Sequence, residues 1–206
     1  PEVHAAYRMK VADFNSDGKD DIFIASFGTY VCGEDNTCAS SSDNHGLLIT
    51  TEDKMVSYSH HIADDNDGNG FLRPSHDASA GDIDGDGDVD IVACSYIMYN
   101  DGDGIFSKYK DLETSWYGGF DEYDNYTQNP IDASSVADFN GDGIDDIILW
   151  FRSDSESLCS TGNSNQTAEA YCGGYIKFGP ILETDSVHVN DDFTRLDNGD
   201  GYYGLN

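Results

Sequence analysis

Three short segments of this chain place acidic and amide side chains at one fixed spacing. They read VADFNSDGKDDIFIA from Val11, AGDIDGDGDVDIVAC from Ala80 and VADFNGDGIDDIILW from Val136, with the shared pattern Asp-x-Asp/Asn-x-Asp-Gly-x-x-Asp. In a tight loop, the side chains at positions 1, 3 and 5 converge on one point, and the carbonyl at position 7 joins them. Gly at position 6 permits the sharp turn. This arrangement of oxygen atoms suits Ca²⁺, which takes six to eight oxygen ligands.

The sequence therefore predicts three calcium sites, each closed by an acid at position 9. The expected ligands are Asp13, Asn15, Asp17, the Lys19 carbonyl and Asp21; then Asp82, Asp84, Asp86, the Asp88 carbonyl and Asp90; then Asp138, Asn140, Asp142, the Ile144 carbonyl and Asp146. The second loop supplies four ligand carboxylates and the others three, which predicts the tightest binding at the second loop.

Two other interpretations of these loops are less favoured. An EF-hand opens with the same spacing but needs a Glu at position 12 and flanking helices. Position 12 is Ile24, Ala93 and Leu149, each inside an apolar run of strand character. Asp/Gly-rich hairpins without a metal are the second alternative. They would leave several carboxylates crowded together, and like charges that close repel one another.

The loops also mark an internal repeat that must position these side chains. The first loop residue moves from Asp13 to Asp82 to Asp138, which gives periods of 69 and 56 residues. Periods of this size suit a four-stranded sheet unit such as a propeller blade. NDGDG at residues 100–104 predicts a hairpin between two strands. We therefore expect an all-β fold of about three four-stranded β-propeller blades, at residues 1–64, 65–130 and 131–206, the last including the start of a following blade.

A family resemblance rests on these residues. The loop followed by DIFIA, DIVAC or DIILW resembles the FG-GAP repeat of integrin α-subunit heads. It resembles even more the VCBS-type repeat of secreted and adhesion proteins, in which an NDGDG-F hairpin follows, as at residues 100–106 here. The resemblance covers nearly the whole chain and implies a β-propeller with a calcium loop between the first two strands of each blade. The insertions at 32–38, 116–129 and 159–172 depart from a minimal repeat.

Three blades are too few to close a propeller, which needs about four to eight. The tail LDNGDGYYGLN resembles the segment DDNDGNGFLRP before the second unit, so a fourth blade is expected to begin there. Three explanations stay open: a fragment of a six- to eight-bladed chain, a half-propeller that pairs with a second copy, or an open array. The first is favoured.

The cysteines and sequons indicate an extracellular protein. Cys32 and Cys38 bracket one short polar loop and Cys159 and Cys172 bracket another, which predicts two disulfides and an oxidising compartment. Zinc is the competing interpretation, but no CxxC pair or suitably spaced His accompanies them. Cys94, inside an apolar run, is expected to be a buried free thiol. Asn125 and Asn165 lie in Asn-x-Ser/Thr sequons and are candidate glycosylation sites.

The charge narrows the possible partners. Asp and Glu total 40 against 10 Lys and Arg, a formal charge of −30, which disfavours nucleic acid and anionic lipid. We expect a calcium-stabilised extracellular scaffold, not an enzyme, that binds a protein or glycan through a loop face. A carbohydrate-binding or polysaccharide-cleaving propeller is the alternative. Its candidate residues would be His60, His61, His76, Tyr117, Tyr123 and Tyr126.

Overall fold

The computed structural model covers the chain and describes ten ranges of residues. These are 6–26, 29–32, 38–41, 46–51, 55–58, 77–93, 96–112, 131–151, 173–187 and 189–196.

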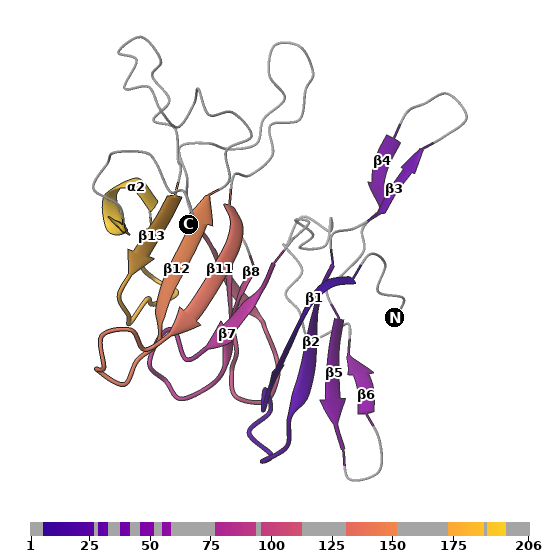
Figure 1. Cartoon of the computed structure of the whole chain (residues 1–206). Coiled ribbons are helices and arrows are strands. Elements are labelled where there is room, and N and C mark those ends of the chain that lie inside the picture. The colour runs from indigo at the N-terminus through magenta and orange to yellow at the C-terminus, as the bar shows by residue number, and fades with distance from the viewer. Residues whose placement is uncertain are drawn as a thin grey trace, which may run out of the picture.

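The described residues form three four-stranded antiparallel sheets, in each of which the strands follow chain order (Figure 1). Sheet 1 contains β1 (Ala6–Ala12), β2 (Asp21–Ser26), β5 (Gly46–Thr50) and β6 (Met55–Tyr58). Sheet 2 contains β7 (Ser79–Gly81), β8 (Asp90–Ala93), β9 (Tyr96–Tyr99) and β10 (Lys108–Asp111). Sheet 3 contains β11 (Ile131–Ala137), β12 (Asp146–Phe151), β13 (Gly173–Lys177) and β14 (Thr194–Arg195).

Two smaller elements complete the described fold. β3 (Thr29–Cys32) and β4 (Cys38–Ser41) pair as a separate ribbon, and α2 (Val189–Asp192) is a single turn of helix. The prediction of an all-β fold is confirmed, and none of the three sheets closes on itself. Within the described ranges, no helix has the length and apolar character needed to cross a bilayer.

The three sheets share one register at their first two strands. Val11 pairs with Ile22, Ala80 with Ile91 and Val136 with Ile147, so each loop joins its strands at the same place. The hairpin predicted from NDGDG is confirmed, because β9 and β10 pair antiparallel on either side of it, with Lys108 opposite Tyr99. The repeated sequence therefore folds as a repeated strand–loop–strand unit.

Sheet 2 lies between the other two and buries both of its faces. On one face, Ile91 and Met98 join a core with residues of sheet 1 such as Phe23. On the other face, Val92 and Ile97 join a core with residues of sheet 3. Because alternate residues of a strand point to opposite faces, a strand buried on both sides must be apolar throughout. This explains the continuous apolar runs of β8 and β9.

The first strands of the sheets lie toward the middle of the molecule, where β7 contacts both β1 and β11 (Figure 1). Asp77, which is buried, joins all three sheets there. Its Oδ1 accepts a hydrogen bond from Arg8 Nε at 3.2 Å, and its Oδ2 accepts one from the Ser134 backbone N–H at 2.9 Å. Ser79 Oγ adds a bond to the Ser134 carbonyl at 2.7 Å. Polar contacts thus join the first strands of the three sheets to one another.

Candidate calcium loops

The three Asp-rich loops occupy equivalent places, each between the first and second strand of its sheet. In Figure 1 they turn at the lower end of the molecule, at β1–β2, β7–β8 and β11–β12. Positions 4 and 6 of every loop have positive φ, at Ser16, Gly18, Gly85, Gly87, Gly141 and Gly143. Two left-handed residues so close together bend the backbone around the side chains of positions 1, 3 and 5.

The carboxylate at position 1 organises each loop from the inside. Asp82 accepts hydrogen bonds from the N–H groups of Gly85 at 2.9 Å and Gly87 at 3.1 Å. Asp13 accepts from Asp17 and Gly18 in the same way. Each carboxylate oxygen has two lone-pair directions, so an accepted N–H leaves capacity for a cation. The position 1 side chains are thus held where the metal prediction needs them.

Asp138 is the position 1 residue of the third loop and follows the same design. It accepts backbone N–H groups of Gly141 at 2.6 Å, Asp142 at 3.1 Å and Gly143 at 2.9 Å. These donors hold the pKa of the Asp138 carboxyl below its usual value, so the group stays ionised.

Positions 3 and 5 bring further oxygens to the same place. In the second loop, ligand oxygens of Asp82, Asp84 and Asp86 all lie within 4.8 Å of one another. Asp84 accepts the Asp86 N–H at 3.2 Å, and Asp86 accepts the Asp88 N–H at 3.0 Å. Three carboxylates at this spacing form a hard-oxygen donor set of the kind that Ca²⁺ takes. The residues present therefore fit the metal.

The electrostatics of the second loop favour a bound cation. Burial, followed by repulsion from the Asp86 carboxylate, raises the pKa of Asp84. In the first loop, the Lys19 ammonium lies 3.3 Å from Asp17 Oδ2, a pairing that leaves both side chains partly exposed. A divalent cation among these carboxylates would relieve their mutual repulsion more strongly than one exposed lysine can.

The acids at position 9 have a structural role that the ligand pattern did not predict. Asp21, Asp90 and Asp146 are buried, and each accepts two backbone N–H groups. One donor is always position 2 of the same loop, namely Phe14, Ile83 or Phe139. The other, Thr50, Asn100 or Gly179, lies at the end of the third strand or just beyond it. Each acid thus ties its loop to the sheet, and its role as a calcium ligand stays a prediction.

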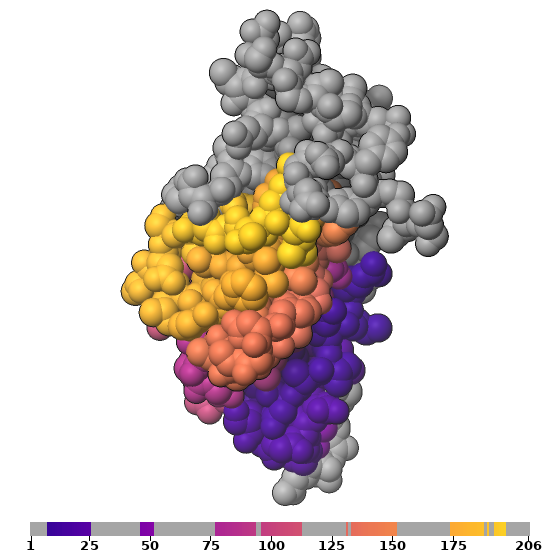
Figure 2. Space-filling view, turned by 60° about the vertical axis from the view of Figure 1, so that its left-hand side comes forward, coloured from indigo at the N-terminus to yellow at the C-terminus, as the bar shows by residue number. Residues whose placement is uncertain are grey.

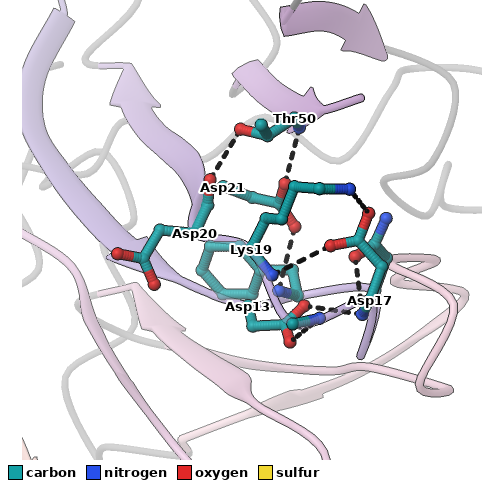
Figure 3. Close-up of polar contacts among 9 residues, drawn as sticks. Asp13, Asp17, Lys19, Asp20, Asp21 and Thr50 are labelled. Atoms are coloured by element: carbon teal, nitrogen blue, oxygen red, sulfur yellow. Dashed lines mark hydrogen bonds and ion pairs between the residues drawn. The ribbon is translucent and has the colours of Figure 1, made fainter. Parts of the chain in front are cut away.

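The first loop shows this tie in detail (Figure 3). Asp21 Oδ2 accepts the Phe14 N–H at 3.0 Å, and Asp21 Oδ1 accepts the Thr50 N–H at 2.7 Å. Thr50 Oγ1 also donates to the Asp20 carbonyl at 2.6 Å. Burial raises the pKa of Asp21 despite these donors. Burial likewise raises the pKa of Asp90 to about 8, and the Asp84 and Asp86 charges add to the effect. A neighbouring cation would favour the charged form of both acids.

Two residues outside the predicted ligand sets join neighbouring loops. Asn100 donates through Nδ2 to the Phe14 carbonyl of the first loop at 2.7 Å and to the Val89 carbonyl of the second at 3.1 Å. Asp145 accepts the Asp82 N–H at 2.9 Å, which connects the third loop to the second. The sequence assigned Asn100 to the NDGDG hairpin and gave position 8 of the loop, Asp145, no ligand role. The residue spacing therefore did not predict these contacts.

The other sequence predictions are addressed only in part. Cys32 and Cys38 are directly paired residues of the β3–β4 ribbon, and their disulfide stays a prediction. The remaining candidates lie outside the described residues: Cys94, Cys159, Cys172, Asn125, Asn165, His60, His61, His76, Tyr117, Tyr123 and Tyr126.

Comparison with known protein families and with curated proteins finds no match to this chain.

Proposed function

We propose that this chain is a calcium-stabilised structural module, with one Ca²⁺ site in each of its three repeated loops. The observation that carries the proposal is the convergence of Asp82, Asp84 and Asp86, whose ligand oxygens lie within 4.8 Å of one another. The same turn, with positive φ at positions 4 and 6, recurs in the other two loops. The carboxylate cluster of the second loop and the backbone turn shared by all three loops support a cation as the common ligand.

The position of the loops supports a structural role for the ion. The position 1 residue follows the first strand of each sheet, and the position 9 acid begins the second strand. Ligands from both sides of the turn would join the end of one strand to the start of the next. Calcium would thereby also neutralise part of a formal charge of −30 that opposes the compact state.

We further propose that the three sheets are blades of a β-propeller in an extracellular scaffold or adhesion protein, as the FG-GAP/VCBS resemblance implies. Four-stranded sheets in chain order, packed face to face with their first strands in the middle, support this architecture. A protein or glycan ligand would then contact a loop face. The paired positions of Cys32 and Cys38 support an oxidising compartment.

Native mass spectrometry with and without a calcium chelator tests the calcium proposal directly. We expect three bound Ca²⁺ ions per chain in calcium buffer and none after chelation. A variant that lacks one position 1 residue, Asp138→Ala, should bind two ions. A matched control, Asp103→Ala in the exposed β9–β10 hairpin, should still bind three. No bound calcium in the unmodified protein would contradict the proposal.

A further inference from the structure

Sheet 1 presents an apolar face on the side away from sheet 2. Met9 and Val11 on β1 are 66% and 62% exposed. Their strand partners on β2 are Ile24 and Ile22, and Ile22 in turn pairs with Leu48 on β5. Side chains of directly paired residues lie on the same face of a sheet. We call the surface formed by these five residues the head face.

The head face is the face that the other two sheets bury. Val11 occupies the same loop-relative position as Ala80 and Val136, both of which pack against the cores between sheets. Ile22 likewise corresponds to Ile91 and Ile147, both fully buried. In sheets 2 and 3 this face packs on the preceding sheet. The described chain has no preceding sheet for sheet 1.

The opposite end of the stack has a matching surface on sheet 3. Ile148 corresponds to Phe23 and Val92, which pack toward the following sheet in sheets 1 and 2. Trp150 corresponds to the fully buried Ala25 but is 43% exposed. Ser135 pairs with Ile148, shares its side of the sheet and is exposed, whereas Ile176, the other partner of Ile148, is already buried within the chain. We call the surface formed by Ile148, Trp150 and Ser135 the tail face. Figure 2 shows sheet 3, in orange and yellow, as outer surface of the molecule.

A directional polar contact within the chain adds to the match. Between sheets 2 and 3, Asp145 accepts the Asp82 N–H, and the Asp145 N–H donates to the Asp82 carbonyl, each at 2.9 Å. Asp20 stands at the position of Asp145 in the first loop. Its carboxylate points away from Asp13 and Asp17 (Figure 3). The residue equivalent to Asp82 at the tail end is Asp138.

We propose that the head face of one copy of this chain packs on the tail face of a second copy, head to tail, with Asp20 accepting the Asp138 N–H of its partner. The apolar packing continues the one that already joins sheet 1 to sheet 2 and sheet 2 to sheet 3. The Asp20 bond would repeat the one between sheets 2 and 3; Val89, at the same position in the second loop, has no carboxylate to offer sheet 1. It is heterologous, because it joins two different surfaces. Two copies joined at both ends would place six sheets in one ring, within the range in which propellers close.

The net charge of the chain makes this association depend on the salt concentration. Two chains of formal charge −30 repel one another, whereas the two faces are held together by apolar burial. Salt screens the repulsion, with a Debye length of about 8 Å at physiological ionic strength. We therefore expect the dimer to tighten as salt is added, opposite to an interface held by ion pairs.

Light scattering after size-exclusion chromatography, over a range of protein and salt concentrations, gives the first test. The unmodified chain should form a dimer that becomes more prevalent at higher salt. Val11→Lys should weaken dimerisation at least about tenfold, because it buries an unpaired charge. Val11→Ala is the matched control and should keep the dimer, since Ala80 occupies this position in the packed sheet 2. A chain that stays monomeric at all concentrations, or a dimer untouched by Val11→Lys, would overturn the proposal.

Mixing two variants tests the head-to-tail direction of the contact. Recovery of a dimer in the mixture also shows that both variants are folded. Val11→Lys damages only the head face and Trp150→Lys only the tail face, so each alone should be monomeric. Mixed, they should form a one-to-one dimer, because one undamaged head still meets one undamaged tail. A face that paired with its own copy would give no such recovery. A mixture that stays monomeric although both variants have the circular dichroism of the unmodified chain would overturn the proposal.

Discussion

The carboxylate of Asp145 accepts a hydrogen bond from the backbone N–H of Asp82, with 2.9 Å between Oδ2 and N. The Asp145 N–H returns a bond to the Asp82 carbonyl, also at 2.9 Å. Asp82 is the first residue of the second Asp-rich loop and Asp145 lies in the third, so these two hydrogen bonds join the loops. A change in one should reach the other through this pair.

Replacing Asp145 with Ala should lower the free energy of unfolding by about 1–3 kcal/mol, the range for hydrogen bonds to charged groups and for partly buried N–H groups left unpaired. It should also weaken calcium binding at the second loop, although Asp145 is not one of the predicted ligands of that loop. Chemical denaturation and titration calorimetry measure the two effects. Asp20→Ala, the same change at the equivalent place in the first loop, is the control and should cost under about 0.5 kcal/mol in dilute solution. Equal effects of the two changes would contradict the coupling.

Asp82→Ala should abolish calcium binding at the second loop. The Asp82 carboxylate both offers ligand oxygens and holds the turn through the Gly85 and Gly87 N–H groups, so no neighbour can replace it. Titration calorimetry should show three sites become two, with the tightest one lost. If the lost site were instead one of the weaker two, the expected order of affinities would be wrong.

Asp90→Asn should destabilise the protein even when no calcium is present. Asp90 is 1% exposed and accepts the Ile83 and Asn100 N–H groups, one on each oxygen. An amide offers only one acceptor oxygen, so one N–H would face an NH₂ group, at a cost of about 1–3 kcal/mol.

The matched comparison for this change is Asp86→Asn, in the same loop. Asp86 is exposed, and its Oδ1 accepts one N–H, which an Asn oxygen can still do. Measured by denaturation in chelator, Asp90→Asn should be clearly the more destabilising, whereas Asp86→Asn should act mainly on calcium affinity. Equal stabilities in chelator would argue against the strand-tying role of Asp90.

Removing calcium should lower the melting temperature and loosen the sheets. Extracellular modules bind Ca²⁺ with dissociation constants near 10⁻⁴–10⁻³ M, so millimolar calcium stabilises by about 0.4–1.4 kcal/mol per site. Three sites give about 1–4 kcal/mol, a large share of a typical stability of about 5–15 kcal/mol.

Calorimetric melting and protease resistance, measured at constant ionic strength, check this expectation. Calcium should restore both, and magnesium should do so poorly because it demands a smaller octahedral shell. Unchanged melting in chelator would show that the loops contribute nothing to stability.

The cysteine prediction is tested by peptide mapping without reduction. We expect bonds Cys32–Cys38 and Cys159–Cys172, with Cys94 free. The first pair is supported by its direct opposition across β3 and β4. A bridge that contains Cys94 would refute the pairing.

The sequence by itself determined the loops and the strands around them. Asp82, Asp84 and Asp86 lie within five residues, so their convergence depends only on the local turn, and glycine at positions of positive φ records that turn directly. The all-β class followed from the apolar runs after each loop, and the hairpin followed from NDGDG. Glycine at position 4, as at Gly85 and Gly141, also indicates a left-handed residue there. The first loop has Ser16 at this position, so its sequence does not indicate the same conformation.

Only the tertiary structure decided which of these residues also hold the sheets together. Asp21 binds the N–H of Thr50, 29 residues away, and Asn100 binds the carbonyl of Phe14, 86 residues away. Such contacts depend on how strands and sheets are placed, and no local pattern encodes them. Ile22, Ile91 and Ile147 show the same limit, because they occupy one position in the repeat and only the last two are fully buried. What differs is whether a neighbouring sheet covers them, and packing between distant segments decides that.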